Sequence, residues 1–435
     1  MASPDRPDRA LAPAELRDAR TALAAARGRK RLDLILEARD PQALVRALPA
    51  DELYLVIRDV GFAEASALVT LASPAQFRTF VDLEAWTGDH FETARALPWL
   101  SAARAGALRD PRAAARWAAK LKGIDREVLY LTLRETLRVH DLEVNDDPEF
   151  ESSHFMRTAE NKFVVEFLVE DEAYQTVRGL VDDLIAEDPF TATRLLSALS
   201  SELPSELEET ALRWRAGRLA DLGYPPLEEA LSWFARPPRA PAERAGVTAR
   251  PPGFLLAESG RATLLDRAVA ALDDGDRDVV EGQLVTAANA VLVANRVDPG
   301  DPERVREALV EARGLVELGL DALAEGDPAR AADVLVDQPL KRIFQEGFGR
   351  LLELRWRAEK LLAAEGAAER LGSPLAEALA ALRTKRPRYF QGLDAPREDW
   401  GTPVAAAFEA RPFGSPHDVR RAAAALDEAE QRLAV

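Results

Sequence analysis

The sequence of 435 residues predicts an all-α protein: a helical-repeat superhelix of short helices with one small β-hairpin near residues 155–167, followed by a second α-helical block. One observation behind this prediction is a series of helix starts, in which Asp or Ser can cap free backbone N–H groups and the next residue, Pro, fits the first helical turn. A second is the recurrence of apolar residues at the i, i+3, i+4, i+7 spacing of one buried helix face. The helix starts are Asp40-Pro41, Ser73-Pro74, Asp110-Pro111, Asp188-Pro189, Asp301-Pro302, Asp327-Pro328 and Ser373-Pro374.

The first 140 residues predict an N-terminal helical arm, residues 1–37, and a helical-repeat domain, residues 38–140. One helix is expected over 14–38, and shorter helices follow at a spacing of about 11 residues. Ser73 and Gln76 have the spacing of a capping box. Because helices this short are unstable alone in water, we expect them to stack on one another. They are expected near 41–47, 50–59, 63–71 and 74–85 and within 111–138.

Residues 141–235 predict an acidic segment that contains the hairpin and several helices. Between Asp141 and Pro189 the chain carries 15 acidic and three basic residues, a net charge of −12. The arms 155–157 and 163–167 are β-branched and aromatic, which predicts two strands. Two strands alone are marginal in water, so we expect the hairpin to pack against helices. The helices are expected at 171–187, 189–202, 205–221 and 226–235.

Residues 236–252 are the predicted linker, because they hold five prolines and few apolar residues. A C-terminal α-helical domain over 253–435 follows. Gly314 and Gly319 interrupt its third helix, where each costs about 1 kcal/mol relative to Ala, and we therefore predict close helix–helix contact at both. The helices are expected near 260–273, 276–296, 302–325, 328–336, 339–365, 374–385 and 416–432, with loops over 386–415.

Two resemblances add to this interpretation. The Asp-Pro start at Asp40, the opening Leu48-Pro49-x-Asp51-Glu52 and the Ser-Pro-x-Gln step at Ser73 resemble the N-terminal cytosolic domain of MgtE-type magnesium transporters, an armadillo-like superhelix. This similarity covers residues 38–86 and implies a superhelical stack there. The whole chain resembles a family of uncharacterised bacterial proteins known only as a domain of unknown function, which implies no activity. The segments that carry this second resemblance are 201–234, 288–299, 318–323 and 410–419.

Composition limits the compartment and the partners. The chain has no cysteine, which excludes disulfides and thiolate metal sites. Met1–Pro13 shows no apolar signal region, and no run approaches the roughly 18 apolar residues of a membrane helix, so we expect a cytoplasmic protein without membrane insertion. The net charge of −17 opposes binding of nucleic acid and of anionic membranes.

The acidic run after residue 140 provides the candidate metal ligands. Its carboxylates are the hard oxygen ligands that Mg²⁺ and Ca²⁺ prefer. The run lacks the glycine turn and spacing of an EF-hand loop, which favours a solvated connector. The candidates are Asp141, Glu143, Asp146, Asp147, Glu149 and Glu151.

Four further patterns bear on a functional site. Asp89-His90-Phe91-Glu92 has the residues of a catalytic or metal site, but a capped helix start is favoured. His140, His154 and His417 have no partner at a metal-ligand spacing. The cluster 383–390 has the composition of a phosphate or nucleic-acid contact. The favoured interpretation is that its cations lie in the last turn of a helix and interact with the helix dipole. The tryptophans are expected in the core, including Trp117, Trp214, Trp233 and Trp356.

No motif indicates an enzyme. The chain lacks a glycine-rich dinucleotide loop, a Walker loop, a nucleophile elbow and a Ser-x-x-Lys pair. We therefore expect a non-enzymatic cytoplasmic scaffold or adaptor, without a cofactor, that binds another protein in the grooves of stacked helices. The alternative is a regulatory module that responds to a divalent cation such as Mg²⁺.

Overall fold

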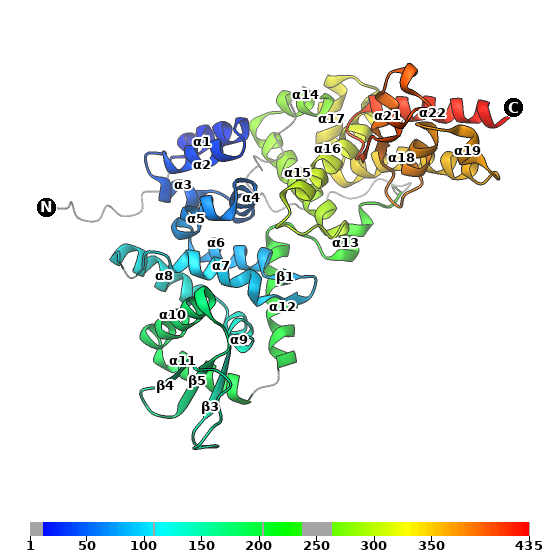
Figure 1. Ribbon diagram of the computed structural model, residues 1–435. Coiled ribbons are helices and arrows are strands. Elements are labelled where there is room, and N and C mark those ends of the chain that lie inside the picture. The colour runs from blue at the N-terminus through cyan, green and yellow to red at the C-terminus, as the bar shows by residue number, and fades with distance from the viewer. Residues whose placement is uncertain (1–11, 108, 202–203, 237–262, 435) are drawn as a thin grey trace. The chain divides into compact units, whose positions relative to one another are not determined.

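The computed structural model describes residues 12–107, 109–201, 204–236 and 263–434 (Figure 1). Helices make up 70% of the structure, against about a third in a typical soluble protein, which confirms the all-α class. The chain forms two compact units, residues 1–222 and 223–435, and each is described here by itself. The predicted linker lies from residue 237 onward outside the described residues, so the boundary within 236–252 stays a prediction.

The N-terminal unit consists of short helices with two small sheets. Its helices are α1 (Pro13–Ala25), α2 (Arg29–Leu36), α3 (Pro41–Ala47), α4 (Ala50–Val60), α5 (Phe62–Leu71), α6 (Pro74–Glu84), α7 (Thr93–Arg104), α8 (Pro111–Gly123), α9 (Arg126–Arg134), α10 (Asp171–Glu187), α11 (Pro189–Ser201) and α12 (Pro204–Asp221). Its strands are β1 (Trp86–Thr87), β2 (His90–Phe91), β3 (Leu137–Asp141), β4 (Phe155–Arg157) and β5 (Phe163–Phe167).

The C-terminal unit contains the longest helices. They and their shorter neighbours are α13 (Leu227–Ser232), α14 (Leu264–Ala271), α15 (Asp274–Ala294), α16 (Pro302–Ala324), α17 (Pro328–Asp337), α18 (Leu340–Leu362), α19 (Ala367–Leu371), α20 (Leu375–Leu382), α21 (Pro403–Ala406) and α22 (Pro416–Ala434). The region 386–415, predicted as loops, also holds two 3₁₀ turns and a strand pair, β6 (Tyr389–Phe390) with β7 (Ala410–Arg411).

Six of the seven predicted helix starts are confirmed by cap hydrogen bonds. In each, the Asp or Ser side chain accepts from a backbone N–H in the first turn of the helix, as Asp40 does from Ala43 at 3.0 Å. The others are Ser73, Asp110, Asp188, Asp301 and Asp327. The prediction is wrong at Ser373, because Pro374 occupies the cap position of α20 and the Ser373 hydroxyl bonds no other described residue.

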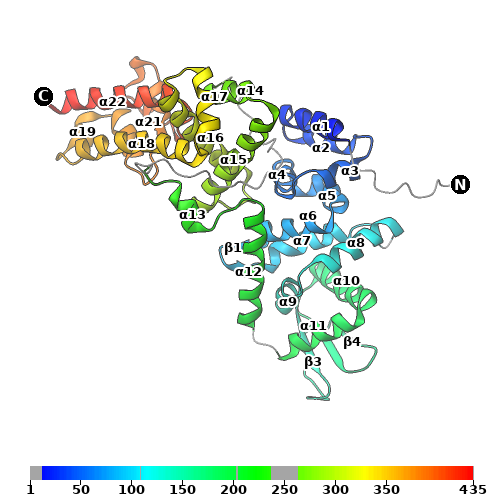
Figure 2. The ribbon, with the colours of Figure 1, turned by 180° about the vertical axis from the view of Figure 1, so that it is seen from behind.

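The short helices of the N-terminal unit stack as the sequence predicts. α4 packs against α6, α5 against α7 and α6 against α8, an order that can be followed from both sides in Figures 1 and 2. Gln76 closes the predicted capping box on α6 and also donates from Nε2 to the carbonyls of Val45 (2.7 Å) and Leu48 (2.8 Å) at the end of α3. The stack of short helices is therefore present, and a superhelical repeat stays a prediction.

The single helix predicted over 14–38 is wrong. The chain leaves α1 after Ala25 and enters α2 at Arg29, and Gly28 between them has φ of 49°. A residue with a side chain rarely adopts that conformation, so the glycine permits a turn that the Ala- and Leu-rich composition did not indicate.

A buried carboxylate fixes α12 on the N-terminal stack. Asp82 of α6 is 1% exposed and accepts from Nε (2.7 Å) and Nη2 (2.8 Å) of Arg218. The same guanidinium reaches Asp125, which precedes α9, at 2.6 Å. Burial raises the pKa of Asp82, and the Arg218 hydrogen bonds and charge oppose that shift. α12 is thus held by a paired charge rather than by apolar contact alone.

The predicted hairpin near 155–167 is confirmed as β4 and β5, and a third strand joins it. β3 pairs with the other edge of β5, which gives the antiparallel order β3-β5-β4. The helical prediction over 111–138 is therefore wrong beyond Arg134, where α9 ends. Five residues of strand directly after a helix are too few for their period to stand out in the sequence.

The C-terminal unit is organised around the crossing of α16 and α18. A Cβ atom placed on Gly319 would overlap the carbonyl oxygen of Ile343, and one on Gly347 would overlap that of Leu315. A Cβ atom on Gly314 would likewise overlap the carbonyl oxygen of Phe413. The predicted helix–helix contact is therefore confirmed at Gly319, whereas at Gly314 it is wrong, because the close neighbour is the segment that precedes α22.

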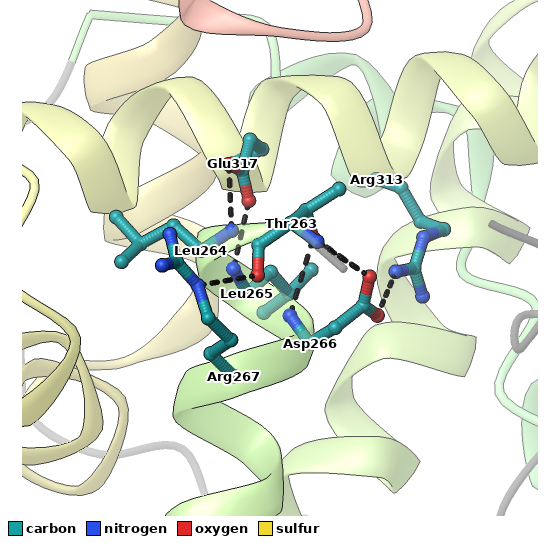
Figure 3. A network of polar contacts seen from close by, with 7 residues as sticks. All are labelled: Thr263, Leu264, Leu265, Asp266, Arg267, Arg313 and Glu317. Atoms are coloured by element: carbon teal, nitrogen blue, oxygen red, sulfur yellow. Dashed lines mark hydrogen bonds and ion pairs between the residues drawn. The ribbon is translucent and has the colours of Figure 1, made fainter. Parts of the chain in front are cut away.

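A second buried carboxylate fixes α14 on α16 (Figure 3). Glu317 of α16 accepts from the backbone N–H groups of Leu264 (3.0 Å) and Leu265 (2.8 Å). Thr263 and Asp266 complete a capping box at the same helix end, and Arg313 binds Asp266 at 2.5 Å. A negative charge at a helix N-terminus satisfies free N–H groups and interacts favourably with the helix dipole.

The glycine crossing gives the first prediction. Gly319→Ala should destabilise the C-terminal unit by about 3 kcal/mol or more, because the new methyl group meets backbone that cannot rotate away. The corresponding transition in a thermal melt followed by circular dichroism should fall by roughly 6–12 °C. Gly349→Ala on α18 is the matched control, since nothing lies within 4 Å of its Cβ position, and it should gain up to about 1 kcal/mol. Equal melting of the two variants would show that the crossing is not tight.

Candidate functional site

The three-stranded sheet carries the acidic segment that the sequence singled out. On one face of the sheet, Phe167 meets Tyr174 of α10 edge-on, with ring centroids 5.3 Å apart. On the other face, the register places Arg138, Glu166 and Phe155 side by side across the strands. The connection from β3 to β4, residues 142–154, folds back over the middle of this second face at Glu166, while Arg138 and Phe155 stay exposed.

Glu166 anchors that covering segment. Its side chain has no exposed surface. The carboxylate accepts from the backbone N–H groups of Ser152 (2.6 Å) and Glu151, and His140 Nε2 lies 2.9 Å from Oε2. Burial alone would raise the pKa of Glu166, but the hydrogen bonds from His140, Ser152 and Glu151 hold it below its ordinary value. The buried group is therefore a charged carboxylate with donors on both oxygens.

His140 and Glu166 are a pair that sequence spacing did not reveal. They lie 26 residues apart and meet only because β3 and β5 pair in this register. Side chains alternate between the two faces of a strand, so the sequence of β5 places Glu166 on the face opposite Phe167. Its contact with His140 could not be predicted in this way, because His140 lies on the unpredicted strand β3.

The candidate metal ligands occupy local turns of the acidic segment. Asp141 accepts from the backbone N–H of Glu143 at 2.9 Å, and the Glu143 carboxylate lies 3.1 Å from Lys162 Nζ. Asp146, Asp147 and Glu149 are exposed. Across the described residues, no group of three or more His, Asp or Glu side chains is arranged to hold a metal ion. A divalent-cation site in this run stays a prediction.

Two aromatic side chains lie in the open beside the acidic segment. Phe150 stacks face to face on Phe155 with ring centroids 4.8 Å apart. The rings of Phe150 and His140 meet in a T-shaped arrangement with centroids 5.3 Å apart. Phe150 is 38% and Phe155 is 51% exposed. A stacked pair that remains this exposed leaves apolar area available to a partner.

β4 is an edge strand with outward backbone groups. The carbonyl of His154 accepts from Phe167 N–H at 2.8 Å, and Thr158 N–H donates to the Phe163 carbonyl at 3.0 Å. Because antiparallel pairing alternates, the N–H and C=O groups of Phe155 and Arg157 point away from β5. This edge, with the stacked pair Phe150 and Phe155, is the candidate site and is called the β4 edge below.

The motif Asp89-His90-Phe91-Glu92 is not the predicted helix start. His90 and Phe91 form β2, which pairs with β1, and α7 begins only at Thr93. His90 Nδ1 lies 3.9 Å from a Glu208 carboxylate oxygen, with most of the ring exposed. A two-residue strand pair replaces the expected first turn.

The basic cluster 383–390 is only partly explained by a helix end. Arg383 is the C-cap of α20, as the dipole interpretation requires. Arg386 and Arg388 lie beyond the helix and donate to carbonyls elsewhere in the unit, those of Ala294 (2.8 Å) and Ala410 (3.2 Å). The two arginines therefore do not close α20, and Arg386 instead binds the last carbonyl of another helix, α15.

The expectation of buried tryptophans is half correct. Trp117 and Trp233 are buried, whereas Trp214 is 59% and Trp356 is 43% exposed. The guanidinium of Arg236 lies 4.4 Å from the Trp356 ring centroid, so this ring is partly covered by a cation rather than by the core.

Comparison with known proteins places the chain in a family. Residues 8–435 match a protein-family model described as "Family of unknown function (DUF6178)". The chain belongs to this family. No curated protein and no solved structure matches it. The resemblance of residues 38–86 to MgtE-type transporters is not shown by these comparisons and stays a prediction, and none of the helices in the described ranges is long and apolar enough to cross a bilayer.

The Glu166 anchor predicts a pH-dependent loss of stability. Glu166→Gln should cost about 1–3 kcal/mol at pH 7 in urea unfolding, because charged hydrogen bonds become neutral ones. The wild-type advantage is fully present above the unfolded-state pKa of about 4.3 and is lost as the pH falls through the lower folded pKa. The difference between the two proteins should therefore begin to shrink near pH 4.3 and vanish only below the folded-state pKa of Glu166. Glu149→Gln, at an exposed position, is the control and should change little; equal effects of both substitutions would contradict the anchor.

The acidic run gives a second prediction. Millimolar Mg²⁺ or Ca²⁺ should shift the melting temperature no more than NaCl of equal ionic strength, because local turns and Lys162 account for the positions of Asp141 and Glu143. The measurement is a set of thermal melts on the wild type and on the double variant Asp146→Asn, Asp147→Asn. A shift seen only with the divalent ion and lost in the variant would establish a cation site.

Proposed function

We propose that the chain is a non-enzymatic scaffold or adaptor of the cytoplasm that binds another protein, and that an extended segment of this partner pairs with the β4 edge. The observation that carries the proposal is the pair of outward backbone positions, Phe155 and Arg157, next to an exposed aromatic pair. A free edge supplies main-chain hydrogen bonds to an added strand, and neighbouring side chains supply the specificity.

Charge selects the partner's composition. The exposed carboxylates Glu143, Asp146, Asp147 and Glu149 belong to a segment with a net charge of −12. A segment that carries Lys or Arg is attracted to this field, whereas an acidic one is repelled. The same field opposes nucleic acid as the partner.

The stacked pair selects the partner's apolar residues. In an added strand, successive side chains point to opposite faces, so one set lies over Phe150 and Phe155 while the other lies toward the α10 face. We therefore propose a partner segment in which basic and β-branched or aromatic residues alternate. The alternative, a module that responds to a divalent cation, rests on the acidic run and is decided by the melts described above.

The proposal is tested with two labelled peptides, one of alternating Lys and Val and one of alternating Glu and Val. Fluorescence anisotropy at low salt should give at least about tenfold tighter binding of the Lys peptide. Arg157→Pro should weaken that binding by about tenfold, because it removes an outward N–H without removing a bond to β5.

Phe190→Ala is the matched control. Phe190 lies on α11 of the same unit and is 72% exposed. This control therefore tests whether an exposed aromatic residue away from the β4 edge contributes to peptide binding. Its removal should leave the peptide affinity unchanged. Equal binding of both peptides, no binding of either, or full binding by Arg157→Pro would overturn the proposal.

A further inference from the structure

The C-terminal unit contains a cavity that is separate from the β4 edge. Its volume is about 330 Å³, at the lower end of the range for small-molecule pockets. Its walls come from the end of α15, one face of α16, the middle of α18, the segment 386–388 and the segment 412–413. Two of the segments that carry the family resemblance, 288–299 and 410–419, thus meet at this cavity.

One wall is apolar. It is formed by side chains that pack near the α16–α18 crossing: Ala308, Leu315, Phe348, Leu351 and Phe413. Such a wall accommodates the apolar part of a ligand. It disfavours an inorganic anion, because the anion loses its hydration there and the apolar side chains form no hydrogen bonds in return.

Arg386 supplies a guanidinium to the cavity wall. It donates from Nη2 to the Ala294 carbonyl at 2.8 Å, and its guanidinium lies 3.9 Å from the centroid of the Phe234 ring. These two contacts fix its orientation. Its Nη1 is covered by the protein and has no hydrogen-bond partner among the described residues. Arg386 is half-buried and lines the cavity, so an anionic acceptor in the cavity approaches a guanidinium that no carboxylate of the described chain occupies.

Glu311 supplies the second polar group. It is partly accessible because it faces the cavity, and protein surrounds the rest of its side chain. Asn295 Nδ2 donates to one of its oxygens at 2.7 Å. Burial raises the pKa of Glu311, and the charge of Arg386 and the Asn295 hydrogen bond oppose the shift. In its protonated form the carboxyl group donates an O–H to an acceptor in the cavity.

The remaining charges of the cavity wall are already paired. Arg388 forms an ion pair with Glu307, and Arg304 lies 3.8 Å from Asp301. Arg386 has no ion-pair partner within 4 Å in the described ranges. Arg386 is therefore the guanidinium of the wall that is left for an anionic ligand, and one such group matches one negative charge.

We propose that this cavity binds a small organic monocarboxylate with an apolar body, whose carboxylate accepts from the Arg386 guanidinium and from the Glu311 carboxyl group. A guanidinium N–H and a carboxylate form a short, charge-assisted hydrogen bond, which accounts for the choice of a carboxylate. The apolar wall accounts for the body. The proposal does not depend on the β4 edge.

Ligand-observed saturation-transfer NMR on the full-length protein tests this proposal. The probes are benzoate and hexanoate, with benzamide and hexanamide as uncharged counterparts of the same shape and inorganic phosphate as the bare anion. Benzoate or hexanoate should bind at least about tenfold more tightly than its amide, and phosphate should not compete. This comparison uses the wild-type chain alone and therefore does not depend on the folding of any variant.

Three substitutions assign the binding to the cavity. Arg386→Gln should abolish carboxylate binding, whereas Glu311→Gln should retain it, because the amide still donates a hydrogen bond. Ala308→Val should weaken binding by filling part of the apolar wall. Arg383→Gln is the control: this arginine belongs to the same basic cluster, is exposed and does not line the cavity.

Three results would overturn the proposal. If the amides bind as tightly as the acids, the cavity recognises apolar shape without charge. If phosphate competes and its binding requires Arg386, the site is one for inorganic anions. If neither carboxylate binds, or if Arg386→Gln folds and binds as the wild type does, the cavity is not a carboxylate site.

Discussion

The close approach of two helices is the constraint on which the C-terminal unit depends. Gly319 and Gly347 bring the backbones of α16 and α18 together, and Gly314 brings α16 against the carbonyl of Phe413. α16 thus contacts two other segments through backbone, with no side chain between them. The cavity lies beside these contacts, since Leu315 and Phe413 belong both to the glycine contacts and to its wall. Larger residues at the glycines would separate the walls, so the geometry that stabilises the unit also shapes its pocket.

Buried carboxylates connect elements that are distant in sequence, and each is satisfied in a different way. Glu317 accepts two N–H groups at the start of α14, and Glu166 accepts two N–H groups of the covering segment on the sheet. Asp82 is paired with Arg218 through two hydrogen bonds. Such groups are costly to bury without partners, so each fixes the position of the element that supplies its donors. Arg386, by contrast, lines the cavity and has no carboxylate within 4 Å in the described chain, which makes it a candidate binding group.

Local chemistry in the sequence predicted much of the fold. An Asp or Ser before Pro indicated six helix starts correctly, because capping involves residues within one turn. Gly319 indicated a close helix crossing, because a glycine inside a long helix destabilises the helix unless close packing compensates for it. Features that depend on tertiary pairing were missed. The strand β3 is too short to show its period, and the contact of His140 with Glu166 follows from its register. Arg386 was assigned to the end of the helix that precedes it, whereas the carbonyl that it binds, Ala294 at the end of α15, is 92 residues away.

The pocket links the α16–α18 crossing to a function, and a crystal structure with 4-bromobenzoate is its most direct test. The bromine atom gives an anomalous signal that locates the ring independently of the protein. We expect the bromine between Phe348, Leu351 and Phe413, with the carboxylate at hydrogen-bond distance from the Arg386 guanidinium and from Glu311. A cavity that contains only ordered water at saturating ligand, or a bromine signal confined to the protein surface, would contradict this assignment.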